Sequence, residues 1–418
     1  MDIKNINELF GISESFMLPE RLMTLLFTDE IYGIYEKYAE MQGDLSYDGF
    51  TEYFQEEHSS RKAMMQDFTP RELTELVGRL AGTDAESCLD VCAGTGGLTI
   101  ALHSIAPKCI FFCEELSRRA LPLLLFNLAV RNISAYVTNK DVLSGEVFGC
   151  YEVVPGKRFG SVRSIYSVPD TEVDVCITNP PYSLKWEYNE KQHDPRFDEY
   201  GYPPKQFSDM GFIIHGMSRL KYSGRIVAIL PHGVLFRGNK EADIRRRMAE
   251  RGSIHAVIGL PDKLFQNTNI PVAVVIFGRE HADRVVFIDG SKGFEKDSKY
   301  NRLRDKDIEK IIDTVGSCAE VPKYSHIAGI NEIIENDYNL NISRYVDTYE
   351  PPPPVDIVAV TKELATIKRD IAVLYAEIQA SIMQLRARDS RTAAELEEVK
   401  KIFAEMLENE QVRTDKAV

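Results

Sequence analysis

Short apolar runs alternate with longer amphipathic segments through the central part of the chain. A short apolar run bounded by turn residues is typical of a buried strand, and apolar spacings of three and four are typical of a helix. This alternation predicts an α/β fold in which helices cover a mostly parallel sheet. The predicted strands lie near residues 87–92, 109–113, 134–138, 173–178, 225–230, 254–259 and 272–277.

A helix is predicted to begin near Thr69 and to lead into this sheet. Thr69 is a suitable N-cap, and Pro70 suits the first helical turn. The apolar face of this helix consists of Leu73, Leu76, Val77 and Leu80. The preceding residues 1–66 are predicted to form a region of short helices, and no chemistry is predicted for them.

A heptad pattern follows a proline spacer near the end of the chain. After Pro351 to Pro354, apolar residues recur at alternating spacings of three and four, which is typical of a coiled-coil seam. The seam residues are Ile357, Val360, Leu364, Ile367, Ile371, Leu374 and Ile378. A turn is predicted within residues 386–391, after which Leu396, Val399, Phe403 and Met406 restart the pattern. The two segments could pair with each other or with a separate protein. We therefore divide the chain into residues 1–66, 67–349 and 350–418.

Composition indicates a globular protein of two or three structural units. The chain has 418 residues, of which 44% are hydrophobic. It has no stretch of about 18 uninterrupted apolar residues, which a membrane-spanning helix needs. The first residues lack a basic segment followed by an apolar one. We therefore expect a cytoplasmic protein without a membrane partner. The seven cysteines, an odd number, favour reduced thiols over disulfides.

Two cysteine pairs raise the possibility of a zinc site. Cys88 and Cys92, and then Cys109 and Cys113, have C-x-x-x-C spacing. Both pairs fall in predicted strands, where their members would lie about 13 Å apart, too far for one zinc ion. We interpret them as buried thiols and predict no metal site.

The formal net charge of −14 is unfavourable for binding nucleic acid without a partner, since phosphate contacts supply most non-specific affinity. Residues 1–66 carry thirteen acidic and five basic residues, a net charge of −8. A basic cluster does occur at Lys240, 245–247 and Arg251. Its helical spacing is more typical of one charged helix face than of a DNA site.

A glycine-rich turn follows the first predicted strand and opens a helix. The segment is Asp90-Val91-Cys92-Ala93-Gly94-Thr95-Gly96-Gly97. Glycines let a ligand approach the backbone closely, and the exposed N–H groups of the helix start favour an anionic group. Glu114 or Glu115, after the second strand, could bind both hydroxyls of a ribose. The G-x-G-G spacing differs from the dinucleotide fingerprint, so an NAD enzyme is the less favoured alternative.

Two further segments follow later strands. Asp141, after the third strand, could bind the exocyclic amine of an adenine ring or could simply cap a turn. Asn179-Pro180-Pro181-Tyr182 follows the strand at 173–178. The prolines fix the backbone and remove two N–H donors, so carbonyl oxygens and the Asn179 amide can face a substrate while Tyr182 offers a flat ring. This combination suits a planar amine.

These motifs, in this order, resemble the S-adenosylmethionine-dependent amino-methyltransferases that act on adenine in DNA. The matching residues are Phe68 to Pro70, Asp90 to Gly97, Glu114 and Glu115, Asp141, and Asn179 to Tyr182. More specifically, the chain looks like the modification subunit of type I restriction-modification systems. The resemblance covers roughly residues 67–347 and includes Asp194 to Phe197, Gly224 to Pro231 and Asp337 to Asn341. The chain departs from the family at Val91, Ala93 and Thr95, and its N-terminal region is short for the family.

The resemblance implies a Rossmann-like methyltransferase fold with a seven-stranded sheet and C-terminal coiled-coil helices. It implies that S-adenosyl-L-methionine is bound by Thr69, Asp90, Cys92, Ala93, Gly94, Thr95, Gly96, Gly97, Glu115 or Glu114, and Asp141. In catalysis, Asn179 and the Pro180 carbonyl would accept the N6 hydrogens of an adenine flipped out of the duplex. Pro181 would hold the loop, and the base would stack on Tyr182. Phe265 would cover its second face, unless Phe265 is a core residue.

The resemblance also implies partners. These are double-stranded DNA, a specificity subunit bound through residues 356–410, a second copy of the modification subunit, and a restriction subunit. No segment of a hundred or more residues is left over for reading DNA sequence, which also favours a separate specificity subunit. Enzymes that methylate a protein glutamine or an RNA base have similar N-P-P-Y sites and are one alternative. A non-catalytic assembly subunit is the other.

Overall fold

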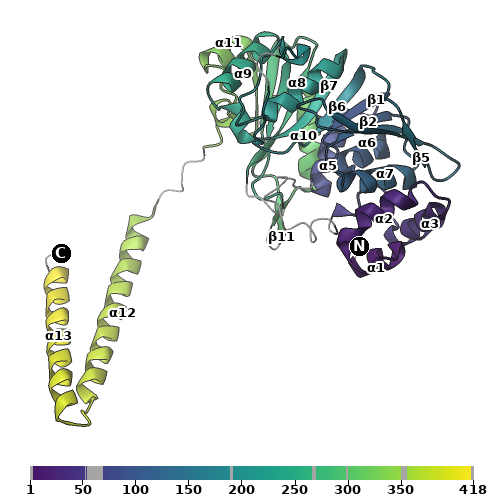
Figure 1. The fold of residues 1–418 in the computed structure, drawn as a ribbon. Helices are drawn as coiled ribbons and strands as arrows, with labels where there is room; N and C mark the ends of the chain where they lie inside the picture. Colours follow the sequence, from purple (N-terminus) through teal and green to yellow (C-terminus); the bar gives the residue numbers. More distant parts are fainter. Residues whose placement is uncertain are drawn as a thin grey trace. The chain divides into compact units, whose positions relative to one another are not determined.

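The computed structural model describes residues 3–51, 53, 69–188, 192–265, 270–297, 300–349 and 355–415. The chain consists of two compact units, residues 1–349 and residues 350–418. The N-terminal unit contains the sheet, and the C-terminal unit contains two long helices (Figure 1). The predicted boundary at residue 66 lies outside the described residues.

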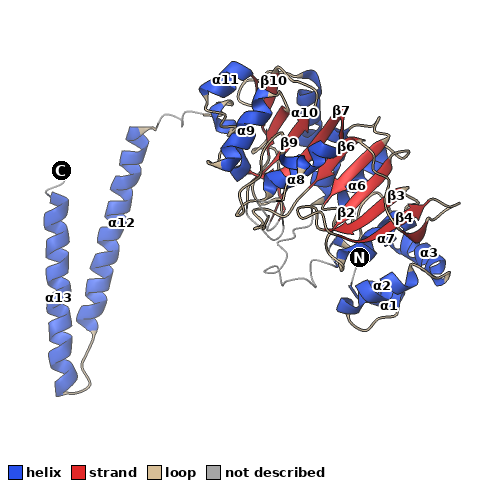
Figure 2. Cartoon of the chain, turned by 45° about the horizontal axis from the view of Figure 1, so that its top comes forward, coloured by secondary structure: helices blue, strands red, loops and turns tan. Residues whose placement is uncertain are grey.

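An eleven-stranded sheet forms the centre of the N-terminal unit (Figure 2). Its strand order is β13-β10-β8-β9-β7-β6-β1-β2-β3-β4-β5. The bounds are β1 (Ser87–Val91), β2 (Ile110–Glu115), β3 (Ala135–Lys140), β4 (Val147–Val154), β5 (Ser161–Ile165), β6 (Val173–Thr178), β7 (Leu220–Pro231), β8 (Ile254–Gly259), β9 (Val272–Gly278), β10 (Arg284–Asp289) and β13 (Ser325–Gly329). A separate hairpin consists of β11 (Glu295–Asp297) and β12 (Tyr300–Arg302).

All seven predicted strands are confirmed, and the fold class is confirmed with them. They form β1, β2, β3, β6, β7, β8 and β9. Ladders among β3, β2, β1, β6 and β7 are parallel, whereas β9 runs antiparallel to both β7 and β8. The predicted strand number was wrong, because β4 and β5 extend one edge and β10 and β13 extend the other. β5 is mostly exposed and mixes polar and apolar residues, so it lacks the continuous apolar run by which buried strands are recognised, whereas β4 has a mainly apolar sequence that was not predicted as a strand.

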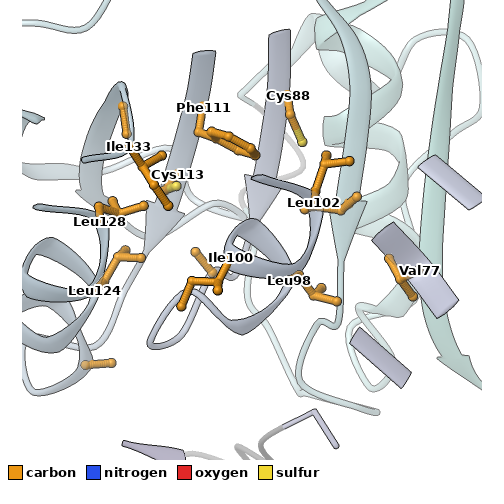
Figure 3. Packing of buried hydrophobic residues seen from close by; sticks show 14 of the residues in the cluster. Val77, Cys88, Leu98, Ile100, Leu102, Phe111, Cys113, Leu124, Leu128 and Ile133 are labelled. Carbon is orange, nitrogen blue, oxygen red and sulfur yellow. The ribbon is translucent and has the colours of Figure 1, made fainter. Parts of the chain in front are cut away.

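Helices cover both faces of the sheet (Figure 2). One face packs against α5 (Arg71–Ala81), α6 (Gly97–Ile105), α7 (Ala120–Val130) and α10 (Asp305–Ser317). Figure 3 shows part of this core, where side chains of α5, α6 and α7 meet Cys88, Phe111 and Cys113 of the sheet. The other face packs against α8 (Asp209–Arg219), α9 (Lys240–Glu250) and α11 (Ile330–Glu335), with the short 3-10 helices η2 (Pro195–Phe197), η3 (His232–Leu235) and η4 (Ile342–Arg344).

The cysteine side chains in question are core residues. Cys88, Cys109 and Cys113 are buried and free, which confirms their interpretation as buried thiols, whereas Cys92 is free but only partly buried and lines a pocket. The structure groups no three His, Cys, Asp or Glu side chains in an arrangement suited to a metal ion within its described ranges.

The N-terminal helices are α1 (Ile3–Phe10), α2 (Leu18–Leu25) and α3 (Glu30–Gln42), with the 3-10 helix η1 (Ser15–Met17). They pack on α7, which is buried all around because the sheet covers its other side (Figure 1). The ring of Phe126 on α7 lies 4.9 Å from that of Tyr38, 5.1 Å from that of Tyr35 and 5.4 Å from that of Phe10, measured between centroids. This aromatic cluster makes the N-terminal helices part of the same compact unit as the sheet.

The C-terminal unit consists of α12 (Ile357–Gln384) and α13 (Ser390–Asp415). The Asp356 side chain caps α12 by accepting a hydrogen bond from the Ala359 amide at 3.0 Å. No residue of α12 is buried, and its seam side chains are exposed by 44% at Ile371 to 75% at Ile357. Within the described residues, α13 therefore does not bury the predicted seam of α12. The proline spacer at 351–354 lies outside those residues.

Among the helices that the structure describes, none has the length and apolar content that crossing a membrane requires.

Candidate active site

The glycine-rich turn connects β1 to α6 and encloses open space. Gly94 and Gly96 have backbone φ angles of +58° and +94°, which favour glycine. A Cβ atom on Gly96 would come within 2.9 Å of the Leu124 side chain, so a larger residue there would have to displace Leu124 as well as adopt the positive φ angle. A Cβ atom on Gly94 would meet nothing within 4 Å. The turn thus presents a cradle above Gly94.

Only one of the two candidate carboxylates contacts this turn. The Glu115 carboxylate accepts hydrogen bonds from the Gly94 amide at 2.7 Å and from the Ser117 amide at 2.6 Å. Glu114, the preceding residue on β2, contacts Lys140 Nζ at 3.2 Å and His215 Nε2 at 2.7 Å. Burial opposes ionisation of Glu114, but the hydrogen bond from His215 and the ammonium of Lys140 outweigh it and hold the pKa of Glu114 below its usual range. Glu114 therefore belongs to an internal charge network.

That network also holds the loop after β3. Arg196 Nη1 lies 3.0 Å from His215 Nδ1, and since arginine can only donate, His215 donates through Nε2 to Glu114. Burial lowers the pKa of His215, in keeping with a neutral ring. Arg196 also donates to the carbonyls of Val142 and Leu143, at 2.7 and 2.9 Å. Arg196 lies in the segment Asp194 to Phe197 that resembles the family, and its contacts with His215 and with the loop give that segment a structural role.

Asp141 lies in this anchored loop at the carboxyl end of β3. Its Oδ1 atom accepts hydrogen bonds from the Leu143 amide at 2.9 Å and from the Ser144 amide at 3.4 Å. This is the ordinary turn-capping arrangement that the sequence also allowed. A role for Asp141 in binding an adenine ring stays a prediction.

Asp90 carries a buried acceptor beneath the turn. Its Oδ2 atom accepts a hydrogen bond from the Thr99 hydroxyl at 2.6 Å, whereas its Oδ1 atom has no partner in the described part of the chain. Burial raises the pKa of Asp90 to about 7. An unsatisfied buried acceptor is unfavourable, so a donor or a positive charge close to Oδ1 would stabilise Asp90, which is fully buried and does not itself line the pocket at the turn.

The loop Asn179 to Tyr182 lies beside the glycine-rich turn. Thr178, at the end of β6, donates to the Val91 carbonyl at 2.6 Å and ties the two loops together. The Asn179 amide nitrogen donates to the Thr69 hydroxyl at 2.9 Å. This bond orients the amide so that Oδ1 faces Tyr182, whose hydroxyl donates to it at 2.7 Å.

Most of the predicted site residues line one pocket. It is lined by Thr69, by residues 92–95, 97 and 98, by Asn179 to Tyr182, and by Asp48 and Thr51. A larger cavity of about 430 Å³ adjoins it and shares Asp48, Thr51, Thr69 and Gly97. Asp48 and Thr51 come from the region for which the sequence predicted no chemistry.

Tyr182 and Phe265 are neighbours but are not parallel. Their ring centroids are 6.2 Å apart, and the rings are perpendicular. Both side chains are buried. A planar base stacks on two rings only if they are parallel, and these two rings are perpendicular. Stacking of the base on both Tyr182 and Phe265 therefore requires one of the two rings to turn, and it stays a prediction.

A network of hydrogen bonds and an ion pair holds Ser183, the residue that follows the N-P-P-Y loop. Ser183, whose φ angle is +54°, donates its amide to Asp209 Oδ1 at 2.9 Å. Arg237 donates to Ser183 Oγ at 3.0 Å and to Asp209 Oδ2 at 3.2 Å. Sequence reasoning missed this support, because a lone aspartate and a lone arginine carry no recognisable motif.

The basic cluster on α9 is directed partly inward. Arg245 is buried and donates to the carbonyls of Val234 and Arg237. Arg251 pairs with Glu199 at 2.9 Å, and Arg246 pairs with Glu250 at 3.3 Å. These pairs agree with the interpretation of the cluster as an ordinary charged helix.

The sequence profile of the family described as N-6 DNA methylase matches residues 39–351. The chain belongs to the N-6 DNA methylase family. The range assigned to the family begins before Asp48 and includes every predicted site residue. Family membership thus confirms the resemblance on which the site residues were selected, although their individual roles stay predictions.

Two curated members of the family are similar to this chain. The type I restriction enzyme MpnII methylase subunit of Mycoplasma pneumoniae is 27% identical over 69% of this chain and 54% of the relative. The MjaVII methylase subunit of Methanocaldococcus jannaschii is 29% identical over 72% of this chain and 53% of the relative. The chain thus spans about half the length of these two methylase subunits.

Solved structures show the same fold. The type I restriction-modification methyltransferase subunit of Streptococcus thermophilus is 33% identical, with a TM-score of 0.60 over 67% of this chain and 59% of that protein. The EcoKI M protein, at 15% identity, has a TM-score of 0.52 over 95% of this chain and 98% of that protein. The second match supports the fold alone.

Proposed function

We propose that this protein is the methyltransferase subunit of a type I restriction-modification system and methylates N6 of adenine in DNA with S-adenosylmethionine. The observation that carries the proposal is one pocket that is lined both by Asn179 and Pro180 of the N-P-P-Y loop and by Gly94 of the glycine-rich turn. Membership of the N-6 DNA methylase family supports it.

The residues around the turn fit such a cofactor. When bound, S-adenosylmethionine would supply an electrophilic methyl group on a positively charged sulfur. Glu115 would bind the ribose hydroxyls, because its carboxylate already lies against the turn at Gly94. The Gly94 cradle leaves room for close approach, and Asp90 Oδ1 offers a buried acceptor without a partner within the described ranges. Thr69, Cys92, Ala93, Thr95, Gly96 and Gly97 would complete the wall, and Asp141 would take the adenine amine.

The N-P-P-Y loop would activate the adenine amine by orienting it. Adenine N6 is a poor nucleophile because its lone pair is delocalised into the ring. Asn179 Oδ1 and the Pro180 carbonyl would accept its two hydrogens, which favours a tetrahedral nitrogen and directs the lone pair toward the methyl group. In this transfer the N–C bond would form as the bond between the methyl carbon and the sulfur breaks, the demethylated cofactor would leave with a neutral sulfur, and the nitrogen would release one proton to water. Thr69 holds the Asn179 amide in the required orientation, and Pro181 keeps the loop rigid.

Tyr182 should act through its ring and not through its hydroxyl. Its hydroxyl occupies Asn179 Oδ1, so an incoming amine must displace it. Replacing Tyr182 with phenylalanine is expected to keep kcat within about threefold of wild type, since stacking is retained. Replacing it with alanine should lower the rate by roughly 5- to 150-fold, the usual range for lost base stacking. Single-turnover methylation of duplex DNA by the reconstituted complex measures both. Equal losses in the two variants would contradict a stacking role.

Cofactor affinity is expected to depend on pH through Asp90. Because its pKa is about 7, Asp90 is mostly protonated below that pH in the free protein. A positively charged ligand beside Oδ1 favours the carboxylate, so binding releases a proton and affinity increases with pH. The increase should approach about tenfold per pH unit below pH 7 and level off above it. Calorimetry in buffers of different ionisation enthalpy would detect the proton. Asp90→Asn should flatten the profile, and a flat wild-type profile would contradict the assignment.

The exposed seam of α12 is evidence that this helix binds another protein. An uncovered heptad seam is unfavourable in water, and a helix from another chain can cover it. We propose that a separate specificity subunit binds residues 356–410 and supplies target recognition. A second copy of this subunit and a restriction subunit would complete the assembly on double-stranded DNA.

The deciding experiment uses the complex reconstituted with its specificity subunit. It is incubated with radiolabelled S-adenosylmethionine and duplex DNA, and the modified base is identified. N6-methyladenine at a defined site is expected. Label transferred to protein or RNA would overturn the proposal in favour of another amino-methyltransferase. No transfer at all would favour an assembly subunit.

A further inference from the structure

A segment from the N-terminal helical region forms part of the pocket wall. Asp48 and Thr51 line the pocket together with the glycine-rich turn and the loop at Asn179. The segment follows α3 and lies far from the turn in sequence. Its contribution therefore depends on how the N-terminal helices pack.

The Asp48 carboxylate makes four hydrogen bonds inside the protein. Oδ1 accepts from the Phe50 amide and from Asn127 Nδ2, both at 2.9 Å. Oδ2 accepts from the Thr51 hydroxyl at 3.2 Å and from the Thr95 hydroxyl at 2.5 Å. Asp48 is only 8% exposed. A buried carboxylate is thus directed at the middle residue of the glycine-rich turn.

A second set of bonds holds the same turn. Asn127 on α7 donates both to Asp48 and to the Thr95 carbonyl, the latter at 2.8 Å. Arg131, one turn further along, donates to Asn127 Oδ1 at 2.7 Å and to the carbonyls of Leu45 and Tyr47 at 2.7 and 2.6 Å. Thr95 is therefore held through its side chain and its backbone, and the Asp48 segment is held on α7.

The turn needs such support because of its own composition. Gly94 and Gly96 flank Thr95, and glycine has more conformational freedom to lose than any other residue. The open cradle exists only while both keep their positive φ angles. Bonds that restrict Thr95 before a ligand arrives reduce the ordering that binding must otherwise supply.

We infer that Asp48 is a positioning residue for the cofactor turn. By holding Thr95 it keeps the glycine-rich turn in its open conformation, so the N-terminal helical region is a working part of the cofactor site. The inference deepens the proposed function and rests on it for the identity of the ligand.

The test replaces Asp48 with asparagine in the full chain. The amide keeps the size of the side chain but presents a donor to one of the groups that now donate to the carboxylate. The dissociation constant of S-adenosylmethionine, measured by calorimetry, is expected to increase roughly tenfold. With saturating cofactor, kcat of the reconstituted complex should stay within about threefold of wild type, since Asp48 touches no reacting atom.

Asp44→Asn is the matched control. Asp44 lies in the same segment, but its side chain is exposed and pairs with Arg71 at 3.1 Å and not with the turn. The same chemical change at Asp44 should leave cofactor affinity and kcat at their wild-type values. A loss as large as that of Asp48→Asn would overturn the inference.

Thr95→Val supplies a second, independent variant. It removes the hydroxyl that donates to Asp48 and leaves the carboxylate in place. If the bond between them carries the effect, the double variant should bind cofactor little worse than either single variant. Independent, multiplying losses would overturn the inference, even if Asp48→Asn alone proved unstable.

Hydrogen exchange of the free protein separates this inference from the proposed cofactor. In Asp48→Asn, the amides of residues 94–97 should exchange several-fold faster than in wild type, whereas those of β2 should be unchanged. Unchanged exchange at the turn would overturn the inference. Failure of the wild-type protein to bind S-adenosylmethionine would instead overturn the proposed function.

Discussion

Replacing Asn179 with alanine is expected to lower kcat for adenine methylation by about 10³-fold, the upper range for loss of one preorganised catalytic group. The variant loses the oxygen that accepts one N6 hydrogen as positive charge develops on the nitrogen. The Pro180 carbonyl remains, so activity falls steeply without disappearing. Because Asn179 acts on the amine, the dissociation constant of S-adenosylmethionine should change by less than about threefold. Rapid-quench methylation and calorimetry measure the two quantities.

A second variant, Asn179→Asp, tests how far the orientation of the acceptor oxygen matters. It keeps an acceptor oxygen but loses the Nδ2 atom that donates to Thr69. The acceptor is then no longer held in one orientation, so an intermediate rate is expected. Thr69→Ala should reproduce part of this loss, because it frees the same amide. A wild-type rate for Asn179→Ala would exclude the N-P-P-Y loop as the catalytic site.

Replacing Leu364 and Ile371 together with glutamate should weaken binding of the specificity subunit by at least about 100-fold. Each side chain is about half exposed in α12, and burial of an aliphatic side chain contributes roughly 1.5–3 kcal/mol. Placing two carboxylates in a coiled-coil seam adds desolvation to this loss. Co-purification and a titrated pull-down measure the binding. Site-specific methylation by the mixture should fall in parallel.

Lys362→Glu with Lys368→Glu is the matched control, since both lysines are exposed on α12 outside the seam. This pair adds the same number of carboxylates and should leave assembly nearly unchanged. Cofactor affinity of the isolated chain should be unaffected in both double variants. If the isolated wild-type chain methylated a defined site at full rate, the proposed dependence on a specificity subunit would be wrong.

Much of the sheet was predictable because buried parallel strands leave a local signal. The runs at 173–178 and 254–259 are mostly apolar, and both form strands with those bounds. β5 was missed because a largely exposed edge strand mixes polar and apolar residues, whereas β4 was missed although its sequence is apolar apart from Gly149 and Glu152. The strand at 225–230 was placed correctly but begins earlier, at Leu220, because pairing with β6 extends it.

The candidate site likewise contains residues that the sequence could identify and residues that it could not. Asn179 and Gly94 were selected from local chemistry and family resemblance, and the structure places both in one pocket. Asp48 could not have been selected, because a single aspartate in an acidic helical region carries no signal of its own. Its importance comes from Thr95 and Asn127, which approach it only after α7 and the N-terminal helices have packed.

The sequence by itself determined where seven of the strands lie along the chain, the two glycine positions that the turn requires, the rigid N-P-P-Y loop and the heptad seam. Each of these depends on a periodicity or on the backbone preference of a residue type, which are local properties. Only the tertiary structure decided that Glu115 and not Glu114 meets the turn, since adjacent strand residues face opposite sides and the packing on each side differs. It alone brought Asp48 to Thr95 and left the seam of α12 exposed, because long-range contacts depend on which surfaces remain uncovered once the chain has folded.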